Sequence, residues 1–126
     1  MHCAMYYPAN YGFIPATLAQ DGDPLDALVV GAVPVVPGSV IRCRPVGVLM
    51  MEDEAGIDEK LLMIPVDKLN PFLRNIKNYL DLPTYMLDQI THFFEHYKDL
   101  EPNKWVKVTG YQNAEQAAQL IRDYMQ

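Results

Sequence analysis

Residues 21–30 have the sequence DGDPLDALVV, in which a turn with three carboxylates leads directly into an apolar run. The glycine and the proline favour a turn, and the four apolar residues that follow predict a buried strand. Two carboxylates about 4 Å apart repel by roughly 4 kcal/mol at an effective dielectric near 20. A hard divalent cation would neutralise Asp21, Asp23 and Asp26, so the stretch predicts a metal site at the start of this strand.

The patterning on both sides of this turn predicts a single α+β domain over residues 1–126, with strands first and helices late. Pro45 and Gly47 interrupt one apolar run, which predicts a bend or bulge in that strand. Asn113 and Gln116 have the spacing of a capping box and predict the start of the last helix. The expected strands are an irregular one within 5–15, then 27–36, a hairpin of 40–51 with 61–66, and 105–111; the expected helices are 70–79, 83–98 and one after residue 113.

Composition excludes several classes of protein. The net charge of −6 and the pI near 4.8 disfavour nucleic acid and anionic membranes as partners. No apolar stretch approaches the roughly 20 residues of a membrane span. The first residues lack the basic region and cleavage pattern of a signal peptide, which predicts a cytoplasmic protein. An acidic protein that handles an anion is expected to do so through bound metal.

Two other kinds of metal site, an EF-hand loop and a histidine pair, fit the sequence less well than the aspartate turn. An EF-hand needs glycine at the sixth position of its loop and glutamate at the twelfth, but Asp26 and Ala32 stand there. A surface turn with locally bonded aspartates remains the alternative. His92 and His96 have the i, i+4 spacing of a zinc pair, yet Glu95 is misplaced for a metalloprotease helix. Helix packing or a subunit interface is the favoured role of the histidines.

Two further segments carry charge in a suggestive pattern. The expected hairpin tip, residues 52–59, is acidic, and such tips are usually solvated surface. Lys60 nevertheless adds a fixed positive charge beside these acids, a mixture suited to a site where metals and an anion meet. Tyr97 and Lys98 follow at the end of the helix expected over 83–98. A lysine there is also explained by the helix dipole alone, so both interpretations stay open.

Several stretches together resemble family I soluble inorganic pyrophosphatases of the bacterial type. The DGDPxD turn is highly specific for that family, and it occurs here together with DEAGxDxK. The matching stretches, which span almost the whole chain in order, are YPANYG at 7–12, DGDPLD at 21–26, PGSVIRCRPVG at 37–47, DEAGIDEK at 53–60, HFFEHYKDLE at 92–101 and KWVKV at 104–108.

The resemblance implies a mainly antiparallel OB-like β-barrel flanked by two or three helices, with Mg2+ and pyrophosphate at its mouth. It implies Mg2+-dependent hydrolysis of pyrophosphate to two phosphates by a metal-activated water, in a homohexamer. Asp23 would act as the general base. The implied metal ligands are Asp21, Asp26, Asp53 and Asp58. The implied substrate-binding residues are Lys60, Tyr97, Lys98 and Tyr11, the last of which would orient a neighbouring group.

The same resemblance implies a preceding segment of some tens of residues, which supplies opening strands and further phosphate- and metal-binding groups. We therefore expect the opening strands of the family fold to be missing here, and either an upstream continuation of the natural protein or impaired activity. Loss of one electrostatic contact in such a site costs about 10²–10³ in rate. The alternative function is thus a catalytically impaired metal- or phosphate-binding oligomerisation module.

The helix expected over 83–98 carries more aromatic surface than one packed face needs. Phe93, Phe94 and Tyr97 are close together in it, with His92 and His96 alongside. Part of this helix is therefore expected to contact another subunit of a homo-oligomer.

Overall fold

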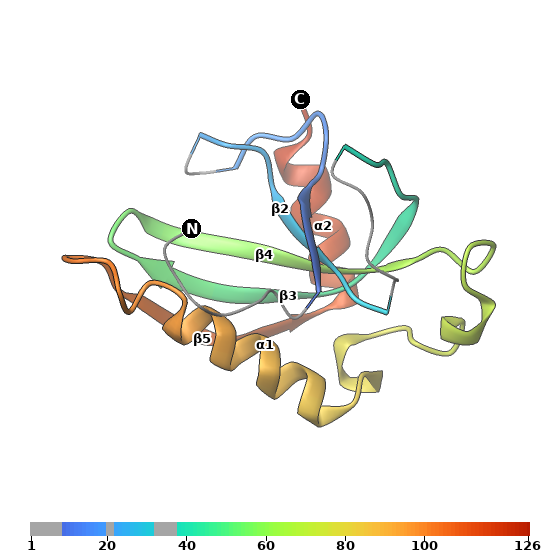
Figure 1. Cartoon of the computed structure of the whole chain (residues 1–126). Coiled ribbons are helices and arrows are strands. Elements are labelled where there is room, and N and C mark those ends of the chain that lie inside the picture. Colours follow the sequence, from blue (N-terminus) through green and yellow to red (C-terminus); the bar gives the residue numbers. More distant parts are fainter. Residues whose placement is uncertain (1–8, 20–21, 32–37) are drawn as a thin grey trace.

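A computed structural model describes residues 9–19, 22–31 and 38–126 of the chain. Strands precede helices along most of the chain, and the predicted α+β class is confirmed (Figure 1). The elements are β1 (Asn10–Phe13), β2 (Asp26–Val29), β3 (Cys43–Asp53), β4 (Gly56–Pro65), the 3-10 turns η1 (Pro71–Leu73) and η2 (Tyr79–Asp81), α1 (Thr84–His96), β5 (Val106–Asn113) and α2 (Ala114–Tyr124).

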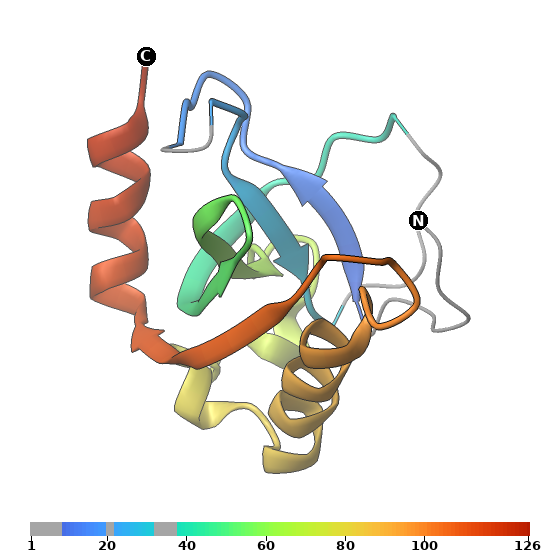
Figure 2. The same cartoon turned by 90° about the vertical axis from the view of Figure 1, so that its left-hand side faces the viewer.

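The five strands form one sheet in the order β1-β2-β4-β3-β5. Every pair is antiparallel except β2 and β4, so the predicted mainly antiparallel sheet is confirmed. The sheet curls around its core, and α1 and α2 pack against it from different sides (Figure 2). No helix in the described part of the chain is long and apolar enough to cross a membrane.

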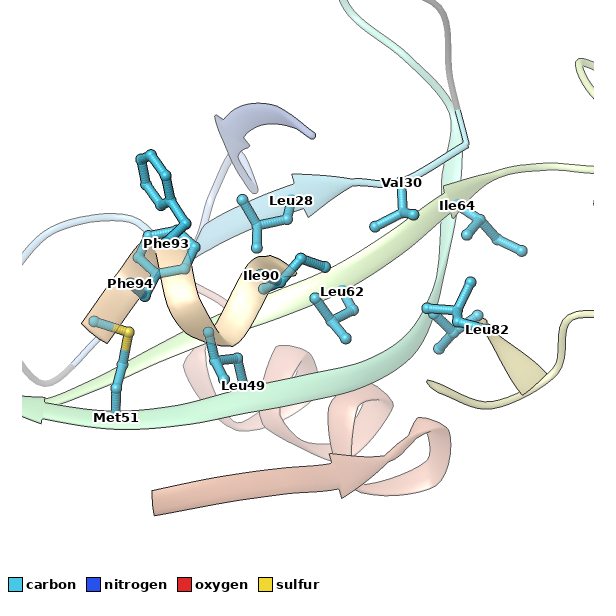
Figure 3. Packing of buried hydrophobic residues seen from close by; sticks show 11 residues of the cluster. Leu28, Val30, Leu49, Met51, Leu62, Ile64, Leu82, Ile90, Phe93 and Phe94 are labelled. Atoms are coloured by element: carbon cyan, nitrogen blue, oxygen red, sulfur yellow. The ribbon is translucent and has the colours of Figure 1, made fainter. Parts of the chain in front are cut away.

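The central strand β4 is buried on both faces, and its side chains alternate between two hydrophobic clusters. Leu62 and Ile64 belong to the larger cluster, which contains Phe94 of α1 (Figure 3). Leu61 and Met63 face the other way and pack with residues of α2. The sheet therefore separates two cores, and each helix covers one of them.

The face that packs against α1 becomes polar at one end of the sheet. In β4 the row of Leu62 and Ile64 continues, at the same period of two, into Lys60 and Asp58. In the parallel pairing of β2 with β4, Asp26 lies opposite Lys60. The fold thus brings these polar side chains to the edge of a hydrophobic core.

Several predicted elements are confirmed with small changes of length. β3 and β4 form the expected hairpin, with a tight two-residue turn at Glu54 and Ala55. The pairing shifts register between Pro45 and Gly47, where the bulge was expected. The capping box that starts α2 is present at Asn113. Of the strand predicted over 27–36, β2 ends at Val29, and residues 32–36 lie outside the described part.

The helix predicted over 70–79 is wrong, because this segment forms the two 3-10 turns instead. The first 3-10 turn already ends at Leu73, and Asn78 caps a separate element, η2, near the end of the expected helix. The guanidinium of Arg44 donates hydrogen bonds to the carbonyl oxygens of Leu73 and Ile76. These carbonyls are satisfied by a distant strand residue, so the segment does not need helical hydrogen bonds.

The aromatic surplus expected on α1 is also explained differently by the structure. Phe93 and Phe94 are 2% and 0% exposed, and both belong to the larger core cluster of their own chain (Figure 3). Their rings meet edge to face, with centroids 5.0 Å apart. The inference of a subunit contact from these two phenylalanines was therefore wrong, because the curled sheet leaves room for both rings inside one chain.

Candidate functional site

The ammonium group of Lys60 is the centre of a buried polar cluster. Its Nζ donates hydrogen bonds to Asp26 Oδ2 at 2.8 Å and to Asp58 Oδ2 at 3.0 Å. It also donates to the hydroxyl of Tyr11 at 3.0 Å. The residue is only 2% exposed, although lysine is rarely buried unless it is paired. Three strands supply these partners, so the cluster exists only in the folded sheet.

Local sequence and strand pairing explain this cluster. Asp58 and Lys60 are two residues apart in β4 and therefore point to the same face. Asp26 is the first residue of β2 and reaches the same face through its register with Lys60. Tyr11 lies in β1, which pairs with β2 on its other side.

A second polar cluster is centred on Lys98, just after the end of α1. Its Nζ donates to Asp53 Oδ2 at 2.9 Å and to Glu54 Oε2 at 3.2 Å. Both acids belong to the tip of the β3–β4 hairpin. The turn holds Asp53 further, since its Oδ1 accepts the backbone N–H of Ala55 at 2.9 Å. The helix end and the hairpin tip are thus joined by ion pairs.

Tyr97 connects the two clusters. Its ring lies 5.6 Å from the ammonium of Lys98 and meets the ring of Phe94 edge to face at 5.4 Å. Burial raises the pKa of the Tyr97 phenol, while the charges of Lys60 and Lys98 act in the opposite direction. The phenol is therefore a neutral hydrogen-bond donor at physiological pH, placed within the field of both lysines.

The lysines themselves remain charged. Burial acts to lower the pKa of Lys60, but the neighbouring Asp58, Tyr11 and Asp26 outweigh it and raise the pKa above the ordinary range. The pKa of Lys98 is likewise raised, because its bonds to hairpin carboxylates exceed the cost of partial burial. Two charged ammonium groups therefore lie at this end of the sheet, each held by neighbouring carboxylates.

Burial and neighbouring groups shift the pKa values of Asp58 and Asp53 in opposite directions. Burial raises the pKa of Asp58, and the attraction of Lys60 only partly compensates for it. Burial acts in the same direction on Asp53, but the hydrogen bonds from Lys98 and Ala55 prevail and lower its pKa. Of these two carboxylates, Asp58 is therefore the one whose charged form is disfavoured by burial, whereas the charged form of Asp53 is favoured by its hydrogen bonds.

The donor set fits a hard divalent cation by its chemistry. Asp26, Asp53 and Asp58 offer only oxygen ligands, which suit Mg2+ better than soft metals. Within the described residues, no group of three or more histidine, cysteine or acidic side chains is arranged as a metal site. Asp21, the fourth predicted ligand, lies outside the described residues.

The remaining predicted residues are more exposed. Asp23 is a solvent-exposed residue of the turn before β2, and its carbonyl oxygen accepts the N–H of Ala19 at 2.8 Å. The rings of His92 and His96 lie on the exposed side of α1 with centroids 4.6 Å apart. Nδ1 of His96 lies 2.8 Å from a carboxylate oxygen of Asp99.

Sequence reasoning missed two participants. Glu54 was treated only as part of an acidic tip, yet it binds Lys98; its position beside Asp53 in a tight turn was the available signal. Phe94 was considered only as part of the aromatic surface of its helix, yet its ring lies 5.6 Å from the Lys60 ammonium. No local signal could have paired Phe94 with a lysine that precedes it by more than thirty residues.

Comparison with known proteins shows the family of the chain. The family model described as inorganic pyrophosphatase matches residues 1–126. The chain belongs to the inorganic pyrophosphatase family. It is therefore an enzyme of a hydrolase family, as the sequence resemblance predicted.

Individual relatives support the family assignment. The chain is similar to the inorganic pyrophosphatase of Caulobacter vibrioides, with 60% identity over 122 residues that cover 97% of this chain and 69% of that protein. The corresponding protein of Pseudomonas aeruginosa is 64% identical over 93% of this chain and 67% of its own length. A solved inorganic pyrophosphatase structure from Helicobacter pylori superposes with a TM-score of 0.94 at 54% identity, over 98% of this chain and 72% of that one.

Proposed function

We propose that this chain hydrolyses inorganic pyrophosphate to two phosphates in an Mg2+-dependent reaction with water as the nucleophile. The observation that carries the proposal is the pair of charged lysine clusters joined by Tyr97, in a chain of the inorganic pyrophosphatase family. Pyrophosphate is a compact, highly charged anion. Two fixed ammonium groups and a neutral phenol at one end of the sheet match it in charge and in hydrogen-bonding capacity.

The substrate-binding residues would be Lys60, Lys98, Tyr97 and Tyr11. Both ammonium groups donate to phosphate oxygens and stabilise the charge that develops on the leaving phosphate. The Tyr97 phenol keeps its proton, and so donates a further hydrogen bond. Tyr11 holds Lys60 through its hydroxyl at 3.0 Å and thereby orients the ammonium.

Asp21, Asp26, Asp53 and Asp58 would hold Mg2+, and Asp23 would act as the general base. When bound, Mg2+ neutralises phosphate oxygens and lowers the pKa of a coordinated water. Asp23 lies two residues after Asp21 and three before Asp26 in the sequence, and it is exposed to solvent. Its carboxylate can therefore accept a proton from a water at the site without giving up a ligand position.

A phosphate-release assay with pyrophosphate and Mg2+ tests this function. The parent chain should release phosphate, and Asp23→Asn should lower kcat by about two orders of magnitude. Asp123→Asn is the matched control, since Asp123 is an exposed aspartate on α2 that accepts a hydrogen bond from Gln119. The proposal is lost if the parent releases no more phosphate than the Asp23→Asn variant.

Calorimetric titration with Mg2+ tests the metal assignment separately. Asp26→Asn and Asp58→Asn should weaken Mg2+ binding, whereas the double variant His92→Ala, His96→Ala should leave it unchanged. Unchanged affinity in both aspartate variants would remove these residues from the metal site. Asp23→Asn should change Mg2+ affinity less than Asp26→Asn does, and the reverse order would exchange their roles.

Further parts of the proposal rest on the sequence and its family resemblance. Residues 1–126 act as one pyrophosphatase-like domain, located in the cytoplasm and with neither nucleic acid nor a membrane as partner. The resemblance also supports a homo-oligomer, with a hexamer as its expected form. Sedimentation of the purified chain measures this assembly directly, and a monomer at all concentrations would contradict it.

A further inference from the structure

Lys60 has two kinds of partner in the structure. Asp26 and Asp58 contact it as carboxylates, at 2.8 and 3.0 Å. The aromatic rings of Tyr11 and Phe94 also lie near its Nζ, with centroids at 5.3 and 5.6 Å. Both distances are within the range in which the negative face of a ring attracts a cation. The ammonium is thus surrounded by charge partners and ring faces together.

The two kinds of partner differ in what else they can bind. Asp26 and Asp58 are proposed metal ligands, so their oxygens are shared between Lys60 and any cation at the site. A benzene ring offers no such ligand to Mg2+ in water. Phe94 is also fully buried and belongs to the larger core cluster, so its ring cannot turn away toward solvent. Its attraction for Lys60 is therefore permanent, whereas that of the carboxylates is not.

We propose that Phe94 is a positioning residue of the active site, whose buried ring face holds the Lys60 ammonium in place for phosphate binding. This inference rests on the proposed function, because it assigns Lys60 to the substrate. It gives a core phenylalanine a role in substrate binding that its place in the hydrophobic cluster does not reveal.

The position of Phe94 on α1 extends this role to the second lysine cluster. Tyr97 follows three residues later and meets the Phe94 ring edge to face at 5.4 Å. Lys98 comes next in the chain and binds the hairpin tip. Phe94, Tyr97 and Lys98 thus lie close together in the sequence at the end of α1, and each has a contact with one of the two lysine clusters or belongs to one. The ring of Phe94 is the contact through which α1 reaches Lys60 directly.

Site-specific fluorination of the Phe94 ring tests the electrostatic part of the proposal. Successive fluorine atoms weaken the negative ring face while the ring keeps nearly the same shape. We expect kcat/KM for pyrophosphate to fall with each step, by about tenfold in total for the pentafluoro ring. Phe93 is the matched control: it is a neighbouring buried phenylalanine of α1 whose ring stacks on Tyr97 at 5.7 Å.

Fluorination of Phe93 disturbs core packing similarly, so it should change the melting temperature without the graded loss of kcat/KM. Equal effects of the two series on kcat/KM would overturn the proposal, as would a Phe94 series without any effect in a parent chain that hydrolyses pyrophosphate. A parent chain without hydrolysis would defeat the proposed function itself, which distinguishes the two failures.

A second measurement does not depend on activity or on a variant. In the metal-free protein, NMR should show nuclear Overhauser contacts between the Phe94 ring protons and the ε-methylene protons of Lys60. These contacts should persist when Mg2+ is added to saturation, because the ring is not a metal ligand. Their absence in the metal-free protein, or their loss on Mg2+ addition, would overturn the positioning role.

Discussion

Replacement of Lys60 by methionine should destabilise the protein in the absence of Mg2+. Methionine keeps the unbranched shape of the side chain but lacks its terminal ammonium group, so Asp26 and Asp58 lose their shared cation. Breaking a fully buried ion pair from one side costs about 3–5 kcal/mol. The Asp26 and Asp58 side chains are 27% and 16% exposed, so water compensates in part. We expect a loss of about 2 kcal/mol, discounted for that exposure.

This loss corresponds to a melting temperature lower by roughly 8 °C for a chain of this size. Saturating Mg2+ should remove most of the difference, because the proposed metal ligands regain a cation. The variant should also bind Mg2+ more tightly than the parent, since the competing ammonium is gone. Thermal melts with and without Mg2+, together with calorimetric titration, measure both effects.

Lys104→Met is the matched control for this prediction. The ammonium of Lys104 lies 3.8 Å from a carboxylate oxygen of Glu101, in a half-exposed ion pair. Such a pair contributes about 0–1 kcal/mol, so its removal should change the melting temperature little at any Mg2+ concentration. If Lys60→Met lowers the melting temperature equally with and without Mg2+, the competition between Lys60 and the metal for these carboxylates is refuted.

Three further variants test other contacts. Lys98→Met should reduce the free energy of unfolding above about pH 4 and make urea unfolding less sensitive to acid. The lowered pKa of Asp53 contributes stability in the parent chain, and this stability is lost as pH falls through that pKa. An unchanged pH profile of the variant would contradict this prediction. Glu59→Gln should stabilise the protein at pH 7 but not at pH 3. Burial raises the pKa of the Glu59 carboxyl, so its ionisation opposes folding as pH rises. Equal gains in the free energy of unfolding at both pH values would show that ionisation of Glu59 is not the reason. Gly47→Ala should cost about 1–3 kcal/mol in a chemical denaturation series, because the new Cβ would lie 2.8 Å from the Cβ of Tyr79. An unshifted midpoint would show that η2 moves away from β3 freely.

Local patterning predicted those parts of the fold that depend on neighbouring residues. The hairpin of β3 and β4 was predicted from the apolar runs on both sides of a polar turn, but the expected tip over 52–59 was too long, because β4 already begins at Gly56 and includes Asp58 and Lys60. The capping box of α2 was predicted from nearby residues, since Asn113 and Gln116 are three residues apart. The DGDPxD and DEAGxDxK stretches also contain Asp26, Asp53 and Asp58, which the structure places in contact with Lys60 or Lys98.

Contacts between distant segments could not be predicted in this way. Asp26 and Lys60 are separated by 34 residues, and nothing local fixes the register of β2 against β4. The failed helix at 70–79 has the same origin, because Arg44 satisfies carbonyl groups of that segment from another strand. Whether Lys98 binds the hairpin tip or only the helix dipole likewise depended on the position of α1 in the folded chain.

The register of β2 against β4 has a consequence for how this chain folds. A pairing shifted by one residue would turn Asp26 to the opposite face, and Lys60 would be buried without that partner. Misaligned chains would therefore be less stable than the native chain. The ion pair of Asp26 and Lys60 thus disfavours slippage of β2 along β4, in addition to the burial of the apolar residues that follow Asp26.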